Sequence, residues 1–215
     1  MPQNEHRNNS TTLSRKERDQ LRRREDFLNA AEELFAEKGY HSTTMEDIAR
    51  EAGYGTGTIY LYFKNKEELY DALFESNLAD HAHFIESRVK AEPNPANKIQ
   101  ALIRARIDFF DQHKRFFRIL LAEWSTGGSS LNRKTHERME TMYKDHLNFV
   151  TQVLSQAMRA GIIRKKDPEH LATAMSGMIS FLLAEWIKKQ SKKSIDQIGD
   201  FVMDLLMKGL EKPHA

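Results

Sequence analysis

Residues that can bind an anion through a side chain or through the backbone are concentrated in one short stretch of this sequence. In chain order they are Thr44, Thr56, Gly57, Thr58, Tyr60, Tyr62 and Lys66. Hydroxyl groups and backbone amides at a helix start donate hydrogen bonds to phosphates, glycine lets the backbone approach closely, and lysine adds a positive charge. The residue types therefore favour non-covalent binding of a partner that carries phosphates.

Two short helices would hold these groups on one surface. Thr43 with Glu46, or Thr44 with Asp47, fits a capping box, so the first of these helices is predicted over residues 45–52. In a capping box each side chain bonds to the backbone amide of the other residue, which fixes the start of the helix. The sequence leaves open which of the two pairs forms.

A glycine-containing turn, Gly53-Tyr54-Gly55, separates this helix from a second one predicted at Thr56 to Tyr62. Two short helices joined in this way form the helix-turn-helix pattern. The second helix is narrow enough to enter the major groove of DNA, which is about 12 Å wide. Many helical proteins contain short helix pairs with half-buried tyrosines, so the pattern alone leaves that alternative open.

The helical period continues along almost the whole chain. Further helices are predicted over residues 16–38, from 66 past 78, and over 99–110, 116–124, 131–159, 168–189 and 195–210. Apolar residues recur there at steps of three and four, and alternating β-branched runs are absent. We therefore predict an all-α fold with a polar, basic tail over residues 1–15, a helix-turn-helix domain over 16–66 and a second helical domain over 67–215.

Composition limits the classes of function. The chain has 215 residues and no cysteine, which excludes disulfides, cysteine-ligated zinc and thiol catalysis. No apolar run approaches the roughly 20 residues that cross a bilayer, and Met1 to Ser14 lack the apolar stretch of a signal peptide. His136 and His146 share no tight spacing with other metal ligands. We expect a cytoplasmic protein with no membrane partner, metal site or cofactor.

A basic cluster precedes the first apolar stripe. It comprises Arg15, Lys16, Arg18, Arg22, Arg23 and Arg24, although the net charge of the chain is only +2. Such a run is typical of a solvated helix start or a polar tail. In a DNA-binding protein it could also reach phosphates or an adjacent minor groove.

The stretch from Ser42 to Tyr70, STTMEDIAREAGYGTGTIYLYFKNKEELY, resembles the DNA-binding motif of the tetracycline-repressor (TetR) family of bacterial regulators. The resemblance extends back through AAEELFAEKGY, residues 30–40. It implies nine helices, of which the first three and the start of the fourth would read DNA. The remaining helices would bind a ligand and a second subunit.

The resemblance also implies roles for single residues. The residues that would hold phosphates are Thr44, Thr58, Tyr62 and Lys66. Those that would lie against base edges are Thr56, Gly57 and Tyr60. Those that would form the core of the small domain are Ile48, Ala49, Ile59 and Phe63.

Two positions depart from the family pattern. Gly55 replaces a polar cap, which removes one polar contact and changes stability by only a few tenths of a kcal/mol. Met45 stands where some members carry a base-reading arginine. Since methionine cannot donate a hydrogen bond, we do not expect Met45 to read a base.

The C-terminal part carries an aromatic and methionine-rich set that the resemblance interprets as a ligand cavity. The candidate residues are Phe109, Phe110, His113, Phe117, Leu120, Trp124, Met142, Tyr143, His146, Met175 and Met178. Adaptable apolar walls with a few polar groups suit an apolar ligand, although each residue also fits an ordinary core. The expected inducer is a hydrophobic or amphipathic small molecule: a drug-like cation, a fatty acyl compound or an aromatic metabolite.

A homodimer is expected, because helix-turn-helix proteins commonly bind half-sites about 34–36 Å apart, one per subunit. The resemblance implies an interface on the last two helices. Its candidate residues are Ala174, Gly177, Phe181, Phe201, Val202 and Leu205. Ligand binding would then shift the arrangement of the two subunits and release double-stranded operator DNA. Repression is the usual outcome in the family and activation the rarer one.

Two other functions compete with a regulator. The sequence contains no GxSxG, P-loop, HExxH or Rossmann glycine pattern that would indicate an enzyme. His113 with Asp108 or Asp111 could still form an acid–base pair. The second rival is a helical ligand-binding protein that has lost its operator. The intact set Thr44, Thr58, Tyr62 and Lys66 argues against it.

Overall fold

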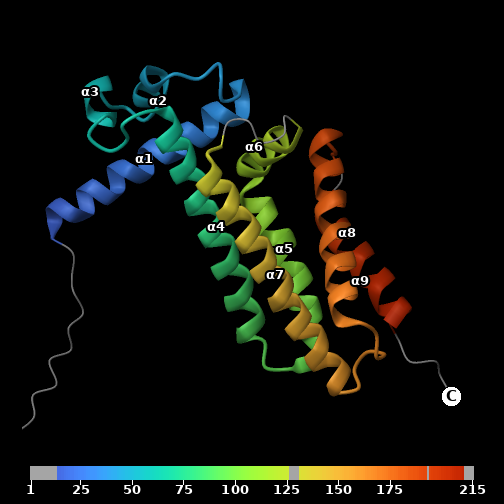
Figure 1. The fold of residues 1–215 in the computed structure, drawn as a ribbon. Coiled ribbons are helices and arrows are strands. Elements are labelled where there is room, and N and C mark those ends of the chain that lie inside the picture. Colours follow the sequence, from blue (N-terminus) through green and yellow to red (C-terminus); the bar gives the residue numbers. More distant parts are fainter. Residues whose placement is uncertain (1–13, 126–130, 193, 211–215) are drawn as a thin grey trace, which may run out of the picture.

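The computed structural model describes residues 14–125, 131–192 and 194–210, and most of these residues are helical. Nine α-helices and one 3₁₀ turn are present in that part of the chain (Figure 1). They are α1 (Arg15–Lys38), α2 (Met45–Glu51), α3 (Thr56–Ile59), α4 (Lys66–Ala91), η1 (Pro95–Asn97), α5 (Lys98–Gln112), α6 (Lys114–Ser125), α7 (Arg133–Arg159), α8 (Pro168–Lys188) and α9 (Asp196–Leu210). The all-α fold predicted from the sequence is confirmed.

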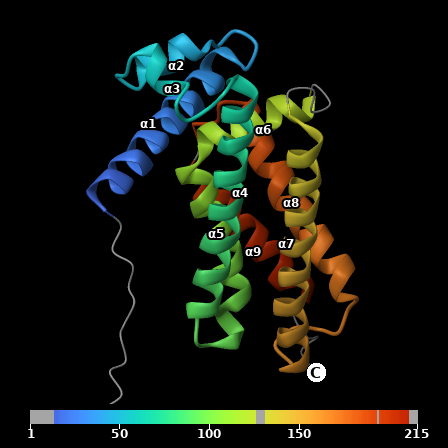
Figure 2. The same ribbon diagram turned by 60° about the vertical axis from the view of Figure 1, so that its left-hand side comes forward.

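The helices form a small unit at one end and a long bundle below it. Helices α1, α2 and α3 lie together at the top of Figure 1, and α4 descends from them beside α5 and α7. The turned view in Figure 2 keeps the same neighbours, with α8 packed against α7 and α9. Helix α6 lies under α1, so the bundle contacts the small unit through both α4 and α6.

The small unit has its own apolar core. The four residues predicted to form it, Ile48, Ala49, Ile59 and Phe63, are all buried, as is Phe27 of α1. Burying a side chain of this size contributes about 1.5–3 kcal/mol, so these residues fix how α1, α2 and α3 pack. Met45 is also buried in this core and faces away from solvent, in agreement with its exclusion from the base readers.

Helix α4 is shared between two cores. Its first half contributes Leu69 and Phe74 to the small unit's core, and its second half contributes Ile85 and Val89 to the bundle core. Phe116 of α6 also packs in the small unit's core, where its ring lies 5.1 Å from that of Phe74. Packing therefore continues across the domain boundary predicted at residue 66.

Buried hydrogen bonds tie the first turns of α4 to the bundle. The Tyr70 hydroxyl donates to Oε1 of Glu123 on α6 at 2.7 Å, and burial, together with this carboxylate, raises the pKa of Tyr70. The next residue, Asp71, accepts a hydrogen bond from Thr135 on α7 at 2.7 Å. Polar groups in such surroundings are costly to leave unpaired, so these bonds hold α4 in one register.

A predicted cap begins α2 and a predicted glycine ends α1, whereas α3 is shorter than predicted. Thr44, not Thr43, caps α2 and forms the capping box with Asp47. Gly39 ends α1 with φ of +79°, a value that residues with a side chain rarely adopt. Helix α3 stops at Ile59 and not at Tyr62, because the amides of Tyr62 and Phe63 both bond to the Ile59 carbonyl in a tight turn.

Helix α8 has a buried apolar face and an exposed apolar face. Within the described residues it is the one helix that is long and apolar enough, by length and composition alone, to cross a membrane. One face of α8 packs into the bundle through Met175, Ile179 and Leu183. The other face is exposed and apolar, and its use is considered below.

The shared position of α4 gives a testable stability difference. Phe74→Ala removes a fully buried ring at the junction of α4 and α6, so we expect the free energy of unfolding to fall by about 3–5 kcal/mol. Leu61→Ala, at a side chain that is 82% exposed, should change it by less than about 0.5 kcal/mol. Urea unfolding followed by circular dichroism measures both, and equal losses would refute the assignment of Phe74 to a core.

Candidate functional site

The predicted DNA-facing residues of the small unit differ in how far they are exposed. Thr44, Thr56, Gly57 and Tyr60 are exposed, and Tyr60 keeps 47% of its surface open. Thr58, Tyr62 and Lys66 are partly buried. Because the apolar residues of α2 and α3 point the other way, the exposed residues are free to meet an external partner.

Thr44 already uses its polar groups within the protein. Its Oγ1 accepts a hydrogen bond from the Asp47 amide at 3.1 Å and donates to the Asp47 carboxylate at 2.9 Å. These bonds lower the pKa of Asp47, with the Thr44 hydroxyl as the largest cause. The predicted capping role is confirmed, and a phosphate at Thr44 would have to share donors with Asp47.

Lys66 has a structural role that the sequence did not reveal. Its Nζ donates to the backbone carbonyls of Tyr40 and Thr43, each at 2.7 Å, and lies 4.4 Å from the centre of the Tyr40 ring. Burial lowers the pKa of this ammonium group. Lys66 thus fastens the α1–α2 connection to the start of α4, and an ammonium group has one further N–H for an outside acceptor.

The turn after α3 presents a side chain that the sequence analysis missed. Leu61 is 82% exposed, whereas the Tyr62 ring packs against Phe27 at 5.5 Å between centroids. Ile59 and Phe63 are both buried, and Leu61 lies midway between them. This spacing was the available signal, because a residue midway between two inward positions of a helical turn points outward.

The basic cluster is helical from Arg15 onward. Ser14 caps α1 in a capping box with Glu17, so Arg15 belongs to the helix and not to the predicted tail; residues 1–13 lie outside the described part of the chain. The Arg23 guanidinium lies 5.8 Å from the Tyr54 ring centre, and that of Arg24 lies 5.3 Å from the Phe63 ring centre. These contacts hold two cations of the cluster beside α3.

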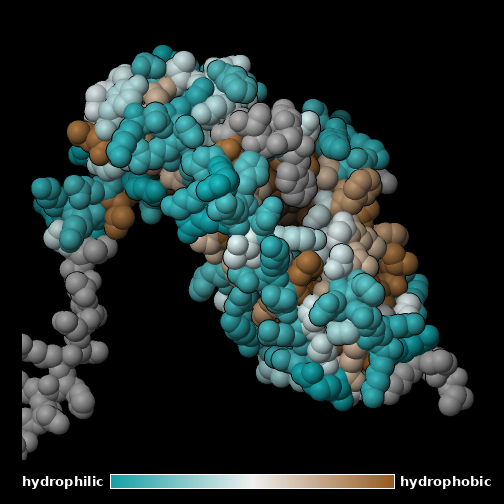
Figure 3. All heavy atoms as spheres, in the orientation of Figure 1, coloured by the Kyte–Doolittle hydropathy of each residue, from teal (hydrophilic) through white to brown (hydrophobic). Residues whose placement is uncertain are grey.

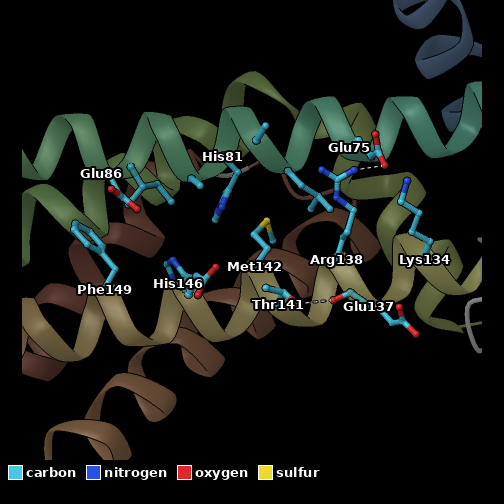
Figure 4. Close-up of a pocket in the computed structure, with 15 residues that line it drawn as sticks. Glu75, His81, Glu86, Lys134, Glu137, Arg138, Thr141, Met142, His146 and Phe149 are labelled. Carbon is cyan, nitrogen blue, oxygen red and sulfur yellow. Dashed lines mark hydrogen bonds and ion pairs between the residues drawn. The ribbon is translucent and has the colours of Figure 1, made fainter.

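A cleft and an inner cavity occupy the bundle. The cleft lies between α4 and α7 and has a volume of about 440 Å³ (Figure 4). Met142, His146 and Phe149 line it from α7, and His81 lines it from α4. The inner cavity of about 50 Å³ lies among α4, α5, α6 and α8, and His81 lines it as well.

Within the described residues, no cluster of three or more metal-ligating side chains is present.

Family models match both halves of the chain. The family described as bacterial regulatory proteins, tetR family, matches residues 27–73. The tetracyclin repressor-like C-terminal domain matches residues 92–210, more than half of the chain. The chain belongs to the TetR family. It is therefore a helix-turn-helix transcriptional regulator that binds DNA.

Known relatives of this TetR regulator match over most of its length. The fatty acid metabolism regulator protein of Bacillus subtilis is 27% identical over 86% of this chain and 93% of its own. The structure of FadR from Bacillus subtilis in complex with stearoyl-CoA is 25% identical, with a TM-score of 0.70, over 87% of this chain and 99% of its own. AibR in complex with isovaleryl coenzyme A and operator DNA is 27% identical, with a TM-score of 0.68, over 84% and 96%.

The predicted ligand-pocket residues are divided by the structure. Those that line the cleft or the inner cavity are Phe110, Phe117, Leu120, Met142 and His146. Those that line neither space are Phe109, His113, Tyr143, Met175 and Met178, and the Trp124 side chain is outside the described part. Met175 is fully buried in the bundle core, whereas Phe109 packs its ring edge against His81, 5.0 Å away.

The predicted dimer residues are mostly exposed on α8 and α9. Ala174, Gly177 and Phe181 follow one another on the outer face of α8, and Phe181 is 67% exposed. Figure 3 shows brown, apolar side chains along the edge of the molecule where Figure 1 draws α8. Phe201 and Leu205 add 54% and 50% exposed side chains from α9.

Val202 corrects one part of the interface prediction. It is fully buried in the chain's own bundle core and cannot line a surface. On α9 the inward face carries Val202 and Leu206, whereas Phe201 and Leu205 face outward. The sequence showed an apolar helix, but an apolar run does not reveal which of its sides the monomer covers.

The buried histidines predict how stability depends on pH. Burial, as the largest cause, lowers the pKa of His81 to about 3 and that of His146 to about 2. Below pH 6.5 the unfolded chain takes up protons at both histidines and the folded chain does not. The free energy of unfolding should therefore fall as the pH drops from about 6.5, by at most about 1.4 kcal/mol per pH unit and histidine, and by less because both rings border the open cleft.

Histidine substitutions distinguish the pH dependence caused by the buried histidines from a general loss of stability in acid. His146→Leu should reduce the pH dependence, because one neutral buried ring is removed. His41→Leu, at an exposed position between α1 and α2, should leave it unchanged. Thermal melts between about pH 7 and pH 5 compare the three proteins, and identical slopes for all three would contradict the prediction.

Proposed function

We propose that the protein is a homodimeric repressor that binds operator DNA and leaves it when an amphipathic small molecule enters the bundle. The observation that carries this proposal is the exposed set Thr56, Gly57, Tyr60 and Leu61, backed by the buried Ile48 and Ile59, in a TetR-family chain. Operator binding implies action in the cytoplasm, where bacterial DNA lies. We propose no catalytic activity.

Some of these residues suit the base edges of DNA and others suit its phosphates. Thr56 and Gly57 are small and let the backbone come close to the groove floor, while Tyr60 reaches base edges. Leu61 has no polar group and suits the methyl group of thymine, which only the major groove displays. The remaining polar residues suit phosphates, and they are Thr44, Thr58, Tyr62 and Lys66.

The ligand proposal is supported by the space between α4 and α7. A cleft of about 440 Å³ falls in the range of roughly 300–1,000 Å³ that is usual for small-molecule sites. Leu78, Ile85 and Phe149 supply apolar walls, and charged residues such as Glu75 and Arg138 lie at one end. The relatives bound to stearoyl-CoA and isovaleryl coenzyme A show that similar proteins accept acyl compounds.

Helix α4 connects the ligand cleft to the DNA-binding unit, so a shift of this helix can release DNA. His81 borders the ligand cleft, and Lys66 at the other end of the same helix holds the α1–α2 connection. A ligand that favours one position of α4 shifts the population of subunit arrangements toward that position. The two recognition surfaces of the dimer then no longer match the helical repeat of DNA.

The acid–base pair considered for an enzyme does not form. His113 stacks on Phe109 at 4.0 Å, and its Nδ1 lies 3.2 Å from the Asn77 side-chain oxygen. Asp108 pairs with Arg88 and Asp111 pairs with Lys114. The carboxylates near His113 are thus committed to other partners, which supports a regulator over a catalyst.

Two substitutions test the proposed phosphate contacts. Tyr62→Phe removes one hydroxyl and should weaken operator binding about threefold to tenfold. Lys66→Ala should weaken it and lower the slope of log affinity against log salt by about 1. Lys90→Ala, at the far end of α4, is the matched control and should change neither quantity. Fluorescence anisotropy with the promoter DNA measures them, and unchanged affinity in both variants would show that the contacts are misplaced.

The dimer surface is tested by one charge. Phe181→Glu puts a carboxylate on the exposed apolar face of α8, so we expect monomers and the loss of operator binding. Leu21→Glu changes an apolar side chain of α1 that is 48% exposed, and it should leave the dimer intact. Light scattering decides, and a Phe181→Glu dimer would exclude this face as the interface.

A further inference from the structure

Arg106 is a buried cation without a counter-ion. It lies on α5, is only 9% exposed, and its Nη2 donates to Oγ of Ser180 on α8 at 2.9 Å. Its Nη1 is buried and has no hydrogen-bond partner. No carboxylate within the described part of the chain comes within 4.0 Å of this guanidinium, although acidic residues make up 31 of the 215 positions.

A group of this kind is costly to bury. Charged side chains inside proteins are normally paired, because removing a charge from water costs several kcal/mol that only a partner offsets. Burial lowers the pKa of Arg106 to about 10, so the group remains a cation at neutral pH. An unpaired cation at this buried position is therefore expected to serve a function that an aliphatic side chain could not perform.

The inner cavity lies directly at Arg106. Its volume of about 50 Å³ exceeds the roughly 10–15 Å³ that one water needs, so a small polar group fits there. Phe110, Phe117 and Leu183 supply apolar walls, and Ser180 and Arg106 supply the polar ones. His81 lines this cavity and also the cleft between α4 and α7, so the two spaces adjoin at one side chain.

Two further polar atoms near this junction have no partner. His81 Nδ1 and His146 Nε2 are both buried without a hydrogen bond. Their rings face each other from α4 and α7 at 5.6 Å between centroids, and Figure 4 shows both pointing into the space between the helices. Arg106 lines the inner cavity, His146 lines the cleft and His81 lines both, so three buried nitrogen groups without a hydrogen-bond partner border the two adjoining spaces.

We propose that this junction binds the carboxylate of an amphipathic organic acid, with Arg106 as its counter-ion and the apolar body of the acid in the α4–α7 cleft. The inference rests on the proposed function and names the chemical class of its ligand. A guanidinium offers parallel N–H groups that match a carboxylate. The apolar walls of the inner cavity and its one buried cation suit a single carboxylate.

The sequence contained a signal for Arg106. It occupies an inward position in the helical stripe of Ile99, Leu102, Ile103, Phe109 and Phe110, all of which are buried. A lone arginine in such a stripe is unusual, since arginine is seldom buried unless it is paired. It was not among the predicted pocket residues, because His113 and His146 were taken as the polar groups of an otherwise apolar and aromatic set.

Matched probes test the charge requirement. Octanoate and octan-1-ol share the same tail, so calorimetry on the full-length protein should show octanoate binding roughly tenfold to a hundredfold more tightly. Octanoyl coenzyme A has a thioester in place of the carboxylate and should bind more weakly than octanoate. Equal binding of octanoate and octan-1-ol, tighter binding of octanoyl coenzyme A, or no binding of any probe would each overturn the inference.

Variants of Arg106 and Arg104 test whether the preference for octanoate depends on Arg106. Arg106→Met should bind octanoate and octan-1-ol equally well, and without ligand it should melt at or above the wild-type temperature, because an unpaired buried charge is gone. Arg104→Met makes the same change on the same helix at a partly exposed residue that pairs with Asp200, and it should keep the preference for octanoate. If Arg106→Met does not fold, Arg106→Lys should retain a reduced preference. A preference that survives in full without the guanidinium would overturn the inference.

Operator binding separates this inference from the proposed function. If the ligand-free protein binds its promoter DNA in a gel shift and octanoate does not bind, the repressor proposal stands and the carboxylate site is wrong. If octanoate binds through Arg106 and no promoter DNA is bound, the site stands and the repressor proposal is wrong.

Discussion

The structure depends on one helix that belongs to two cores. Helix α4 has 26 residues, or about 39 Å at 1.5 Å per residue, and it buries its first half against α1 and α6 and its second half against α5 and α7. Packed interiors resist continuous deformation, so α4 moves as a unit or stays in place. Lys66 at its start and His81 near its middle therefore feel the same displacement.

Polar groups concentrate where this helix meets its neighbours. Tyr70 and Asp71 make buried hydrogen bonds to α6 and α7 close to the small unit. Further down, Arg106 and the two histidines are buried with polar atoms unsatisfied. The first set fixes one register of α4, and the second leaves the bundle less stable than an apolar core would. A ligand that satisfies the second set would change which register is favoured, which is the bistability that a switch needs.

Sequence patterns predicted the features of the fold that depend on the spacing of neighbouring residues. The capping box, the glycine that ends α1 and the inward positions Ile48 and Ile59 all follow from the helical period and from cap chemistry. The apolar set of the C-terminal half could not be sorted in the same way, because core, cavity wall and subunit interface all require apolar residues.

The remaining differences have tertiary causes. Val202 proved to be core and Leu61 surface, since contacts from distant helices decide which side of a segment is covered. The role of Lys66 rests on carbonyls more than 20 residues away, and the isolation of Arg106 rests on the absence of an acid among its neighbours in space. The residues next to Lys66 and Arg106 in the sequence predict neither property.

The coupling through α4 is tested most directly by the distance between the two DNA-binding surfaces of the dimer. The chain has no cysteine, so Glu51→Cys at the exposed end of α2 carries one spin label per subunit. Pulsed electron resonance then gives the distance between the labels with promoter DNA and with saturating octanoate. We expect one distribution on DNA and a clearly different one with octanoate. The same distribution in both states would contradict the account.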